Sequence, residues 1–264
     1  MSDLKKGDKI RMLNGGEATI VGEFGSGGQG TGSTNINLAG NVLSATQSGI
    51  TVVNGGNTQD LIINQTDSTI NGSSYGINSR FSGKGIVDIT AGGNISGNTA
   101  AIYVNDGGSS TDARKITISD GGVVENASKS TSAQAINVVS TKNYQLMVNK
   151  EGVLNGTIAL GTGQNTLTNE GTWNTEGASN FGLAGTNALT NNGLIQVANN
   201  NNTSNVTTTF QNLNNFTNGE NGILSLSNDV TGDTLIIDGN YIGAGGTVLF
   251  DTVLNGDDAC FGEL

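Results

Sequence analysis

A short phrase recurs along the chain from about residue 89 to the C-terminal region. It reads apolar, polar, Asn or Asp, one or more small or polar residues, Gly, and then apolar again. Its copies begin at Ile89, Ile118, Val148, Leu167, Leu189, Phe216 and, in a compressed form, Ile237. Short strands and Gly or Asn turns that repeat at a period of roughly 20 to 30 residues predict a solenoid. A solenoid usually provides a surface or a spacer rather than a pocket.

The composition supports strands that pair with neighbouring coils. The chain has 42 Gly and 37 Asn but no Pro and no His. Each interior strand residue of a solenoid donates an N–H to the next coil, which Pro cannot do. No long segment keeps a helical apolar period, and the short apolar runs are rich in Val, Ile and Thr. We therefore predict an all-β protein.

Two all-β architectures fit short strands, a sandwich and a parallel β-helix. The strands of a sandwich are longer and alternate more cleanly, whereas the dense Gly and Asn corners here favour a parallel β-helix of about nine or ten coils. Aliphatic stacks are expected inside, and Asn ladders are expected at the bends. The predicted interior residues are Ile118, Val148, Leu167, Leu189, Leu224, Ile236 and Leu249, and Trp173 is expected to pack at a coil face.

The charge, the cysteine count and the apolar runs exclude several partners and structural features. Eleven Lys and Arg oppose 22 Asp and Glu, which gives a net charge of -11, and no basic residue follows Lys150. That sign repels nucleic-acid phosphates, so no nucleic-acid partner is expected. Cys260 is the single cysteine, which excludes a disulfide framework. No apolar run is long enough for a membrane-spanning segment, and no signal peptide is recognisable near the N-terminus.

The second half of the chain resembles a known family. The repeats Leu167–Trp173, Leu189–Ile195 and Phe216–Leu224, followed by the stretch Gly239–Asp258, are similar to autotransporter (type V secretion) passenger domains with a pertactin-like stalk. The resemblance covers roughly residues 35–258. It implies a right-handed, single-stranded parallel β-helix at the surface of a Gram-negative bacterium or outside it. It also implies an adhesin or a structural stalk, whose partner is a host-surface ligand or another copy. The full-length protein is expected to carry an outer-membrane barrel.

These patterns divide the chain into three parts. Residues 1–32 form a leader with a capping hairpin, whose strands are expected near Lys9–Leu13 and Ala18–Val21; residues 33–258 form the passenger segment; residues 259–264 form an atypical tail. Because the signal peptide and the barrel are missing from the printed sequence, we expect a fragment, a broken frame or a fusion.

The leader also resembles the Gly-rich loop of protein kinases. Gly25, Gly27 and Gly30 have the G-x-G-x-x-G spacing, but Gly32 stands where a kinase has Val, and no V-A-I-K, H-R-D or D-F-G follows. Such a spacing arises readily by chance in a chain so rich in Gly. We therefore assign no nucleotide site.

Parallel β-helices also include carbohydrate-active enzymes, either polysaccharide lyases and hydrolases or phage tail-spike proteins. Such enzymes need clustered carboxylates with a basic residue nearby. Only one region offers such residue types, namely Asp88, Asp106, Asp112, Arg114, Lys115 and Asp120. Nothing in the sequence singles them out, and one Trp and four Tyr are poor material for sugar-stacking surfaces. The sequence therefore predicts no enzyme and assigns no catalytic, cofactor-binding or metal residue.

The ends of a solenoid need cover, because a terminal coil leaves backbone groups and apolar side chains exposed. The leader hairpin is expected to cap the first coil. The C-terminal edge near Val248–Leu254 is expected to stay open and to pair with another molecule.

Overall fold

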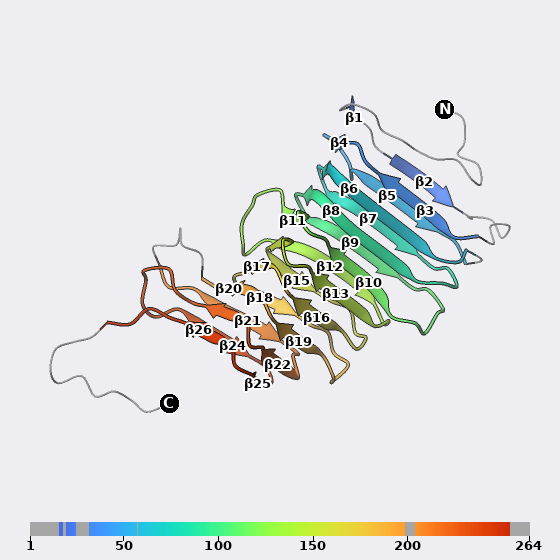
Figure 1. Ribbon diagram of the computed structural model, residues 1–264. Helices are drawn as coiled ribbons and strands as arrows, with labels where there is room; N and C mark the ends of the chain where they lie inside the picture. Colours follow the sequence, from blue (N-terminus) through green and yellow to red (C-terminus); the bar gives the residue numbers. More distant parts are fainter. Residues whose placement is uncertain (1–15, 18–19, 25–31, 57, 199–203, 254–264) are drawn as a thin grey trace.

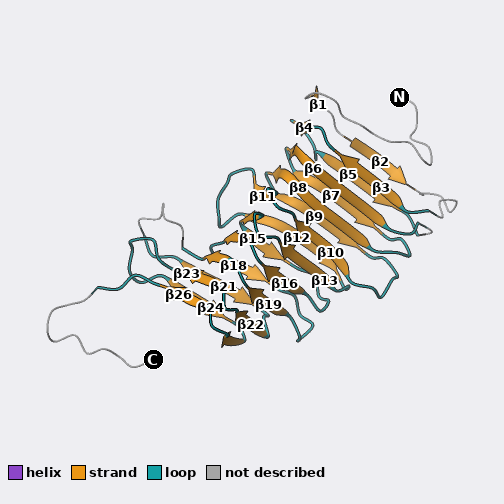
Figure 2. Ribbon diagram, viewed as in Figure 1, coloured by secondary structure: helices purple, strands orange, loops and turns teal. Residues whose placement is uncertain are grey.

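The chain is a parallel β-solenoid. The computed structural model describes residues 16–17, 20–24, 32–56, 58–198 and 204–253, and all elements in these ranges are strands. Successive coils lie side by side along one axis (Figure 1), and Figure 2 shows strands and connecting loops without a helix in the part of the chain described. Each coil contributes up to three strands, which form three rows along the solenoid.

The strands of each row pair in parallel with those of the coils before and after. Row one contains β3 (Thr34–Leu38), the first parts of β6 (Leu61–Gly72) and β8 (Val87–Gly97), β10 (Arg114–Ile118), β13 (Tyr144–Val148), β16 (Thr166–Asn169), β19 (Ala188–Asn191), β22 (Asn215–Asn218) and β25 (Asn240–Gly243).

Row two belongs to the same sheet as row one, because β6 and β8 continue from one row into the other. It contains β1 (Gly16–Glu17), β4 (Val42–Ser44), the second parts of β6 and β8, β11 (Val123–Asn126), β14 (Val153–Asn155), β17 (Thr172–Asn174), β20 (Leu194–Gln196), β23 (Ile223–Ser225) and β26 (Thr247–Leu249).

Row three forms the second sheet. It contains β2 (Ile20–Phe24), β5 (Ile50–Asn54), β7 (Tyr75–Phe81), β9 (Ala100–Asp106), β12 (Gln134–Ser140), β15 (Thr157–Ala159), β18 (Ala178–Asn180), β21 (Thr207–Gln211) and β24 (Thr234–Ile237).

The parallel pairing confirms the predicted β-helix and contradicts the sandwich. From β3 to β24 the described residues complete eight coils, and β25 and β26 begin another, which is slightly fewer than the nine or ten coils expected. Nine row-one strands about 4.8 Å apart span about 38 Å. The right-handed winding of the solenoid stays a prediction.

One inward column shows how the interior is filled. Row one places the following residues in register on successive coils: Ile36, Ile63, Ile89, Ile116, Leu146, Leu167, Leu189, Phe216 and Tyr241. All but Tyr241 are buried. Their side chains close the interior because alternate residues of a strand point to the same face.

The register corrects part of the repeat that we inferred from the sequence. Ile118 lies opposite Val148 as the phrase predicts, but Val148 lies opposite Asn169 rather than Leu167. The compressed copy at Ile237 belongs to row three and pairs with Phe210. The coils differ in length, so a phrase that recurs in the sequence need not recur at the same position of the coil.

Most of the predicted core is confirmed. Ile118, Val148, Leu167, Leu189 and Leu224 are buried. Trp173 is fully buried, donates its Nε1–H to the Gly156 carbonyl at 3.0 Å and stacks on Phe210 with ring centroids 5.1 Å apart. It is therefore a packed residue, as expected.

The prediction is wrong for two residues, Ile236 and Leu249, which are not buried. Ile236 is 48% exposed and Leu249 is 43% exposed. Ile236 lies between Leu235 and Ile237, which pack against the core, so strand alternation turns Ile236 outward. Leu249 follows Val248, which continues the column of Leu224, and so it also points away from the interior.

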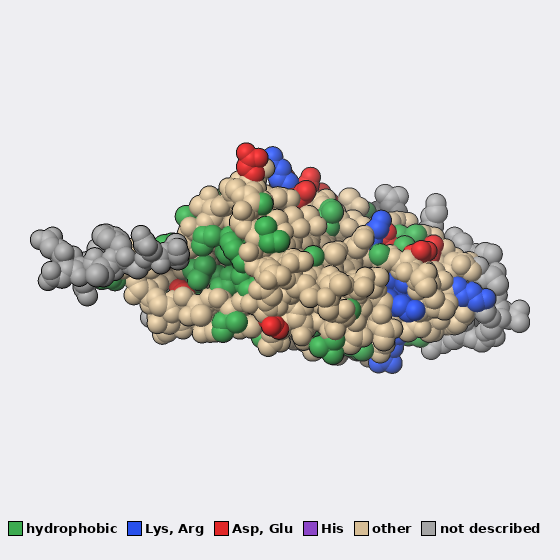
Figure 3. Space-filling view, turned by 90° about the horizontal axis from the view of Figure 1, so that it is seen from below, with side chains coloured by type: hydrophobic (Ala, Val, Ile, Leu, Met, Phe, Trp, Pro, Cys, Tyr) green, Lys and Arg blue, Asp and Glu red, His purple; other side chains and the backbone are tan. Residues whose placement is uncertain are grey.

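The two ends of the described solenoid differ. In β3 the inward residues Ile36 and Leu38 are buried, whereas in β25 and β26 every residue is exposed. Figure 3 shows hydrophobic side chains gathered beside the grey segment at the C-terminal end. Among the exposed residues at this end are Tyr241, Val248 and Phe250. Association through this end stays a prediction, which light scattering of the purified chain at several salt concentrations would test.

The domain boundary near residue 32 is not marked in the sheets. β2 pairs in parallel with β5, and β1 pairs with β4, so rows two and three continue into the leader. Lys9–Leu13, the glycines Gly25, Gly27 and Gly30, and residues 259–264 lie outside the described residues. The hairpin, its capping role and the atypical tail therefore stay predictions.

Candidate functional site

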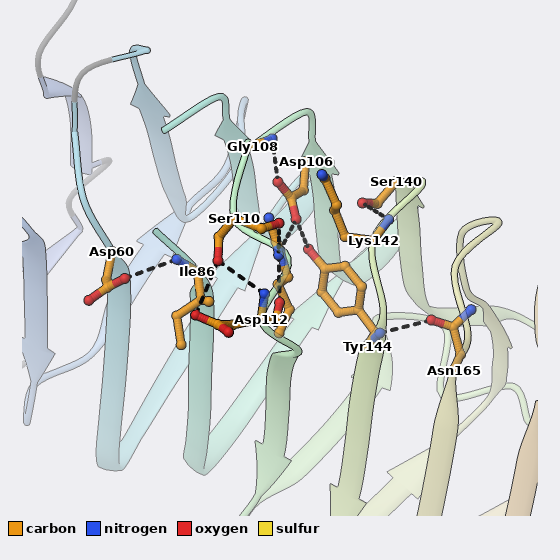
Figure 4. A network of polar contacts seen from close by, with 11 residues as sticks. Asp60, Ile86, Asp106, Gly108, Ser110, Asp112, Ser140, Lys142, Tyr144 and Asn165 are labelled. Carbon is orange, nitrogen blue, oxygen red and sulfur yellow. Dashed lines mark hydrogen bonds and ion pairs between the residues drawn. The ribbon is translucent and has the colours of Figure 1, made fainter. Parts of the chain in front are cut away.

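The strongest polar cluster lies at the corner between rows three and one. Asp106 ends β9 and Arg114 begins β10, and both side chains are fully buried. Arg114 Nε donates to Asp106 Oδ2 at 2.7 Å, which makes a buried ion pair, and Figure 4 shows the network of polar contacts around Asp106. Such a pair is costly to desolvate, so it persists only where further hydrogen bonds satisfy its atoms.

Hydrogen bonds from three sides complete the cluster. Tyr144 donates its hydroxyl to Asp106 Oδ2 at 3.0 Å, and the Gly108 N–H donates to Oδ1 at 2.7 Å. Arg114 Nη1 donates to the carbonyls of Ser110 and Asp112 at 2.9 and 2.6 Å. These hydrogen bonds tie the connection 107–113 to the ion pair. Arg114 Nη2 is buried and has no partner among the described residues.

The cluster also explains why the Tyr144 hydroxyl stays protonated. Burial raises the pKa of Tyr144 well above its ordinary value of 10.0, and the Asp106 carboxylate raises it further because it repels a phenolate and accepts the phenolic hydrogen bond. Tyr144 therefore serves as a hydrogen-bond donor. The ion pair and its hydrogen bonds hold one corner of the solenoid in place.

A second group of charges lies on the outer side of the same corner. Lys115 lies directly opposite Asp88 in the register of β10 and β8. Burial raises the pKa of Asp88, the Lys115 ammonium lowers it, and the Asp60 carboxylate raises it. Asp60 itself accepts the Ile86 N–H at 2.9 Å. These groups are the part of the cluster in which a carboxylate is partly accessible.

The structure thus brings together five of the six residues of the one region that offered carboxylates with basic residues nearby. Asp106 and Arg114 form the ion pair, Asp88 and Lys115 are neighbours on adjacent coils, and Asp112 contributes its carbonyl to Arg114. Asp120 does not join them, because it lies in the exposed turn after the far end of β10. Within the described ranges no group of three or more His, Cys, Asp and Glu side chains has the arrangement of a metal site.

Sequence reasoning missed one aromatic pair. Tyr75 and Tyr103 stack with ring centroids 4.8 Å apart and an interplanar angle of 28°, and both are partly exposed. Their separation in the sequence is close to the length of one coil. The repeat period therefore indicated that the two tyrosines could lie on neighbouring coils, but it did not give the register of row three.

Similarity to known proteins extends over little of the chain. No family model matches the chain, and no solved structure matches it. A 41-residue segment is 54% identical to the protein described as "Probable autotransporter YfaL" from Escherichia coli (strain K12). That match covers 16% of this chain and 3% of the relative.

The class that fold and comparison support together is therefore a parallel β-solenoid with local similarity to an autotransporter. No helix in the described residues is long and apolar enough to cross a membrane.

Proposed function

We propose that this chain is a passenger segment of an autotransporter that acts at a Gram-negative cell surface, or after release from it, as an adhesin or a structural stalk. The observation that carries the proposal is the parallel β-solenoid, together with the 41-residue similarity to a probable autotransporter. A stack of coils with hydrogen bonds along its whole length is suited to span a distance.

The polar corner supports a role that is not enzymatic. Both oxygens of Asp106 accept hydrogen bonds from the protein itself, and both side chains of the pair are fully buried, so the pair is enclosed by the protein rather than open to a substrate. We propose that the corner stabilises the coil on which an extended surface is displayed.

Surface display tests the proposal. The chain would be fused between a signal peptide and the translocation unit of a known autotransporter, and intact Escherichia coli cells would be labelled with an antibody against an epitope tag. We expect labelling of intact cells and its loss after external protease treatment. A fusion without the translocation unit is the control, and it should label only after the outer membrane is permeabilised. A chain that stays inside the cell with the translocation unit present contradicts the proposal.

Asp88 favours a second candidate, a carbohydrate-active β-helix. It is a carboxyl with a raised pKa beside a lysine and a further carboxylate, which are the residue types that general acid–base catalysis uses. Purified chain would be incubated with polygalacturonate and other polysaccharides, and new reducing ends and unsaturated products would be measured. Products that disappear in Asp88→Asn favour this candidate, and no product with the unaltered chain removes it.

A further inference from the structure

The stacked tyrosines lie where row three is widest. β7, β9 and β12 are each 7 residues long, and they lie side by side between β5 and β15 (Figure 1). Tyr103 is in register with Asn78 on one side and Asn137 on the other. Tyr75 comes from the start of β7 and stacks against Tyr103. This brings two of the four tyrosines of the chain to one place on the outer face.

The polar side chains around the two rings form no hydrogen bonds with other described residues. Neither tyrosine hydroxyl forms a hydrogen bond with another described residue, and the side-chain amides of Asn105 and Asn137 form none either. Asn78 Oδ1 is buried and has no partner in the described part of the chain. Each amide offers two N–H donors and an acceptor oxygen.

Amides elsewhere in this protein behave differently. Where Asn residues are in register on neighbouring coils they bond to one another, as in Asn37 with Asn64 and Asn155 with Asn174, at 3.0 and 2.7 Å. On the outer face of β7, β9 and β12 the register places Asn78 and Asn137 on either side of a tyrosine, so no amide ladder forms there. The hydrogen-bonding capacity of this face stays available to a ligand.

The charge of this face limits the classes of ligand that suit it. Of the outward residues in the middle of β5, β7, β9 and β12, Arg80 alone is charged. Aromatic rings with polar tips, flanked by a few donors and acceptors, are typical of sites that bind polar small molecules. Sugars present an apolar C–H face to a ring and hydroxyls to amides. A face with one charge among many neutral groups suits an uncharged sugar better than an acidic one.

We propose that the outer face of β5, β7, β9 and β12, centred on Tyr75 and Tyr103, binds a neutral glycan chain. The rings stack against the sugar, and Asn105 and Asn137 exchange hydrogen bonds with its hydroxyls. Four strands span about 14 Å at the inter-strand spacing, so the ligand is an oligosaccharide rather than a single sugar. This inference rests on the adhesin form of the proposed function and gives it a ligand class.

Binding to defined sugars tests it. The purified full chain would be titrated by calorimetry with cellohexaose, mannohexaose, maltohexaose and N-acetylchitohexaose, and with sialyllactose and polygalacturonate as acidic probes. We expect saturable binding of at least one neutral probe. Tyr103→Ala should weaken it about tenfold, which corresponds to roughly 1.4 kcal/mol.

Two further variants keep the test decisive if Tyr103→Ala fails to fold. Tyr103→Phe keeps the ring and should lose little affinity, whereas Asn137→Ala should weaken binding about threefold to tenfold, the effect of one hydrogen bond. Met147→Ala is the matched control, because Met147 is an exposed residue on the outer face of row one. It should leave binding unchanged.

Three results overturn the proposal: no binding of a neutral probe, binding of acidic probes alone, or unchanged binding in both Tyr103→Ala and Asn137→Ala. Surface display that succeeds without sugar binding removes this inference and leaves the proposed function. Sugar binding without surface display removes the proposed function and leaves the sugar-binding site.

Discussion

One inward column of row one changes its chemistry between the two halves of the solenoid. In the first half the column carries Ala91, Ile118 and Val148, and in the second half it continues with Asn169, Asn191 and Asn218. All six residues are buried. The same place in the coil is filled by aliphatic side chains from Ala91 to Val148 and by amides from Asn169 to Asn218, whereas the coil before Ala91 carries the buried amide of Gln65.

The amides form a ladder. Asn169 Nδ2 donates to Asn191 Oδ1 at 2.8 Å, and Asn191 Nδ2 donates to Asn218 Oδ1 at 2.8 Å. Each Nδ2 also reaches a backbone carbonyl, that of Leu194 for Asn169 and that of Ile223 for Asn191. Aliphatic stacks accept several arrangements of similar volume, whereas buried amides need particular partners. The second half is therefore fixed in register by hydrogen bonds as well as by packing.

The second half also holds the aromatic core. Trp173 and Phe210 stack, and Phe181 and Phe216 contact Phe210 edge to face with centroids 6.0 Å apart. The two shortest row-one spacings lead into and through this half, from Leu146 to Leu167 and from Leu167 to Leu189. Short coils with large rings and amide ladders contrast with the longer aliphatic coils that precede them. The ion pair of Asp106 and Arg114 lies before the change.

The largest effect is expected at that ion pair. Asp106→Asn leaves Arg114 buried without its counter-charge and should cost about 3–5 kcal/mol in the free energy of unfolding. Urea denaturation measures it. Asp112→Asn is the control, because the Asp112 side chain is exposed and Arg114 uses only its carbonyl. The double variant Asp106→Asn, Arg114→Met should cost less than the two single variants together, since neither charge is then left unpaired. A cost below about 1 kcal/mol for Asp106→Asn would show that the pair is not buried.

Truncation of the aliphatic column compares the two halves directly. Leu167→Ala and Ile116→Ala should each cost about 2–5 kcal/mol, because both delete a fully enclosed side chain. The outward Thr168→Ala is the control and should shift the denaturation midpoint little. An unchanged midpoint for Leu167→Ala would mean that Leu167 is not inside the solenoid.

Replacing the middle of the ladder tests whether the amides stabilise the second half. Asn191→Leu removes an acceptor from Asn169 and a donor from Asn218, and should cost about 1–3 kcal/mol for each buried group left unsatisfied. Thr190→Leu, on the opposite side of the same strand, is the matched control. If Asn191→Leu is as stable as the unaltered chain, packing alone defines this half.

Extending the ladder by one coil sharpens the comparison. Asn169 Oδ1 is buried and has no hydrogen-bond partner among the described residues, and Val148 lies directly before it. Val148→Asn supplies a donor for that oxygen, whereas Ile118→Asn places an amide among aliphatic neighbours. Both should be less stable than the unaltered chain, but Val148→Asn should be the more stable of the two by about 1 kcal/mol, the value of one hydrogen bond. Equal losses in chemical denaturation would argue that the ladder cannot be extended.

The smallest effect is expected at Asp251, near the C-terminal end. Its carboxylate accepts the Asn228 N–H at 2.7 Å and the Ser227 hydroxyl at 2.8 Å, and the backbone and side-chain hydrogen bonds lower its pKa below the ordinary value of 3.8. A lowered pKa in the folded state adds stability above that ordinary value, and this contribution is lost as the pH falls through the lowered pKa. Asp251→Asn should therefore reduce the melting temperature slightly at neutral pH and not at strongly acidic pH. A reduction that is the same at both pH values would assign the effect to something other than this titration.

The sequence by itself determined the class of fold. The absence of Pro, the density of Gly and Asn, and a recurring apolar phrase leave few alternatives to stacked coils, because each coil must pair its backbone with the next. Burial of Leu167, Leu189 and Trp173 followed from the same phrase. The sequence also indicated the residue types of the polar corner, since Asp106, Arg114 and Asp112 lie close together in the chain.

Only the tertiary structure decided which coil faces which. Coils of unequal length shift the register, so the sequence did not reveal that Val148 precedes Asn169, that Ile236 and Leu249 point outward, or that Tyr144 reaches Asp106 from the next coil. It also did not bring Tyr75 and Tyr103 together. Side-chain alternation has a period of two, so a shift of one residue in a turn reverses what is inside and what is outside. Local composition predicts that a strand forms, but backbone hydrogen bonds to the neighbouring coil fix which of its faces is buried.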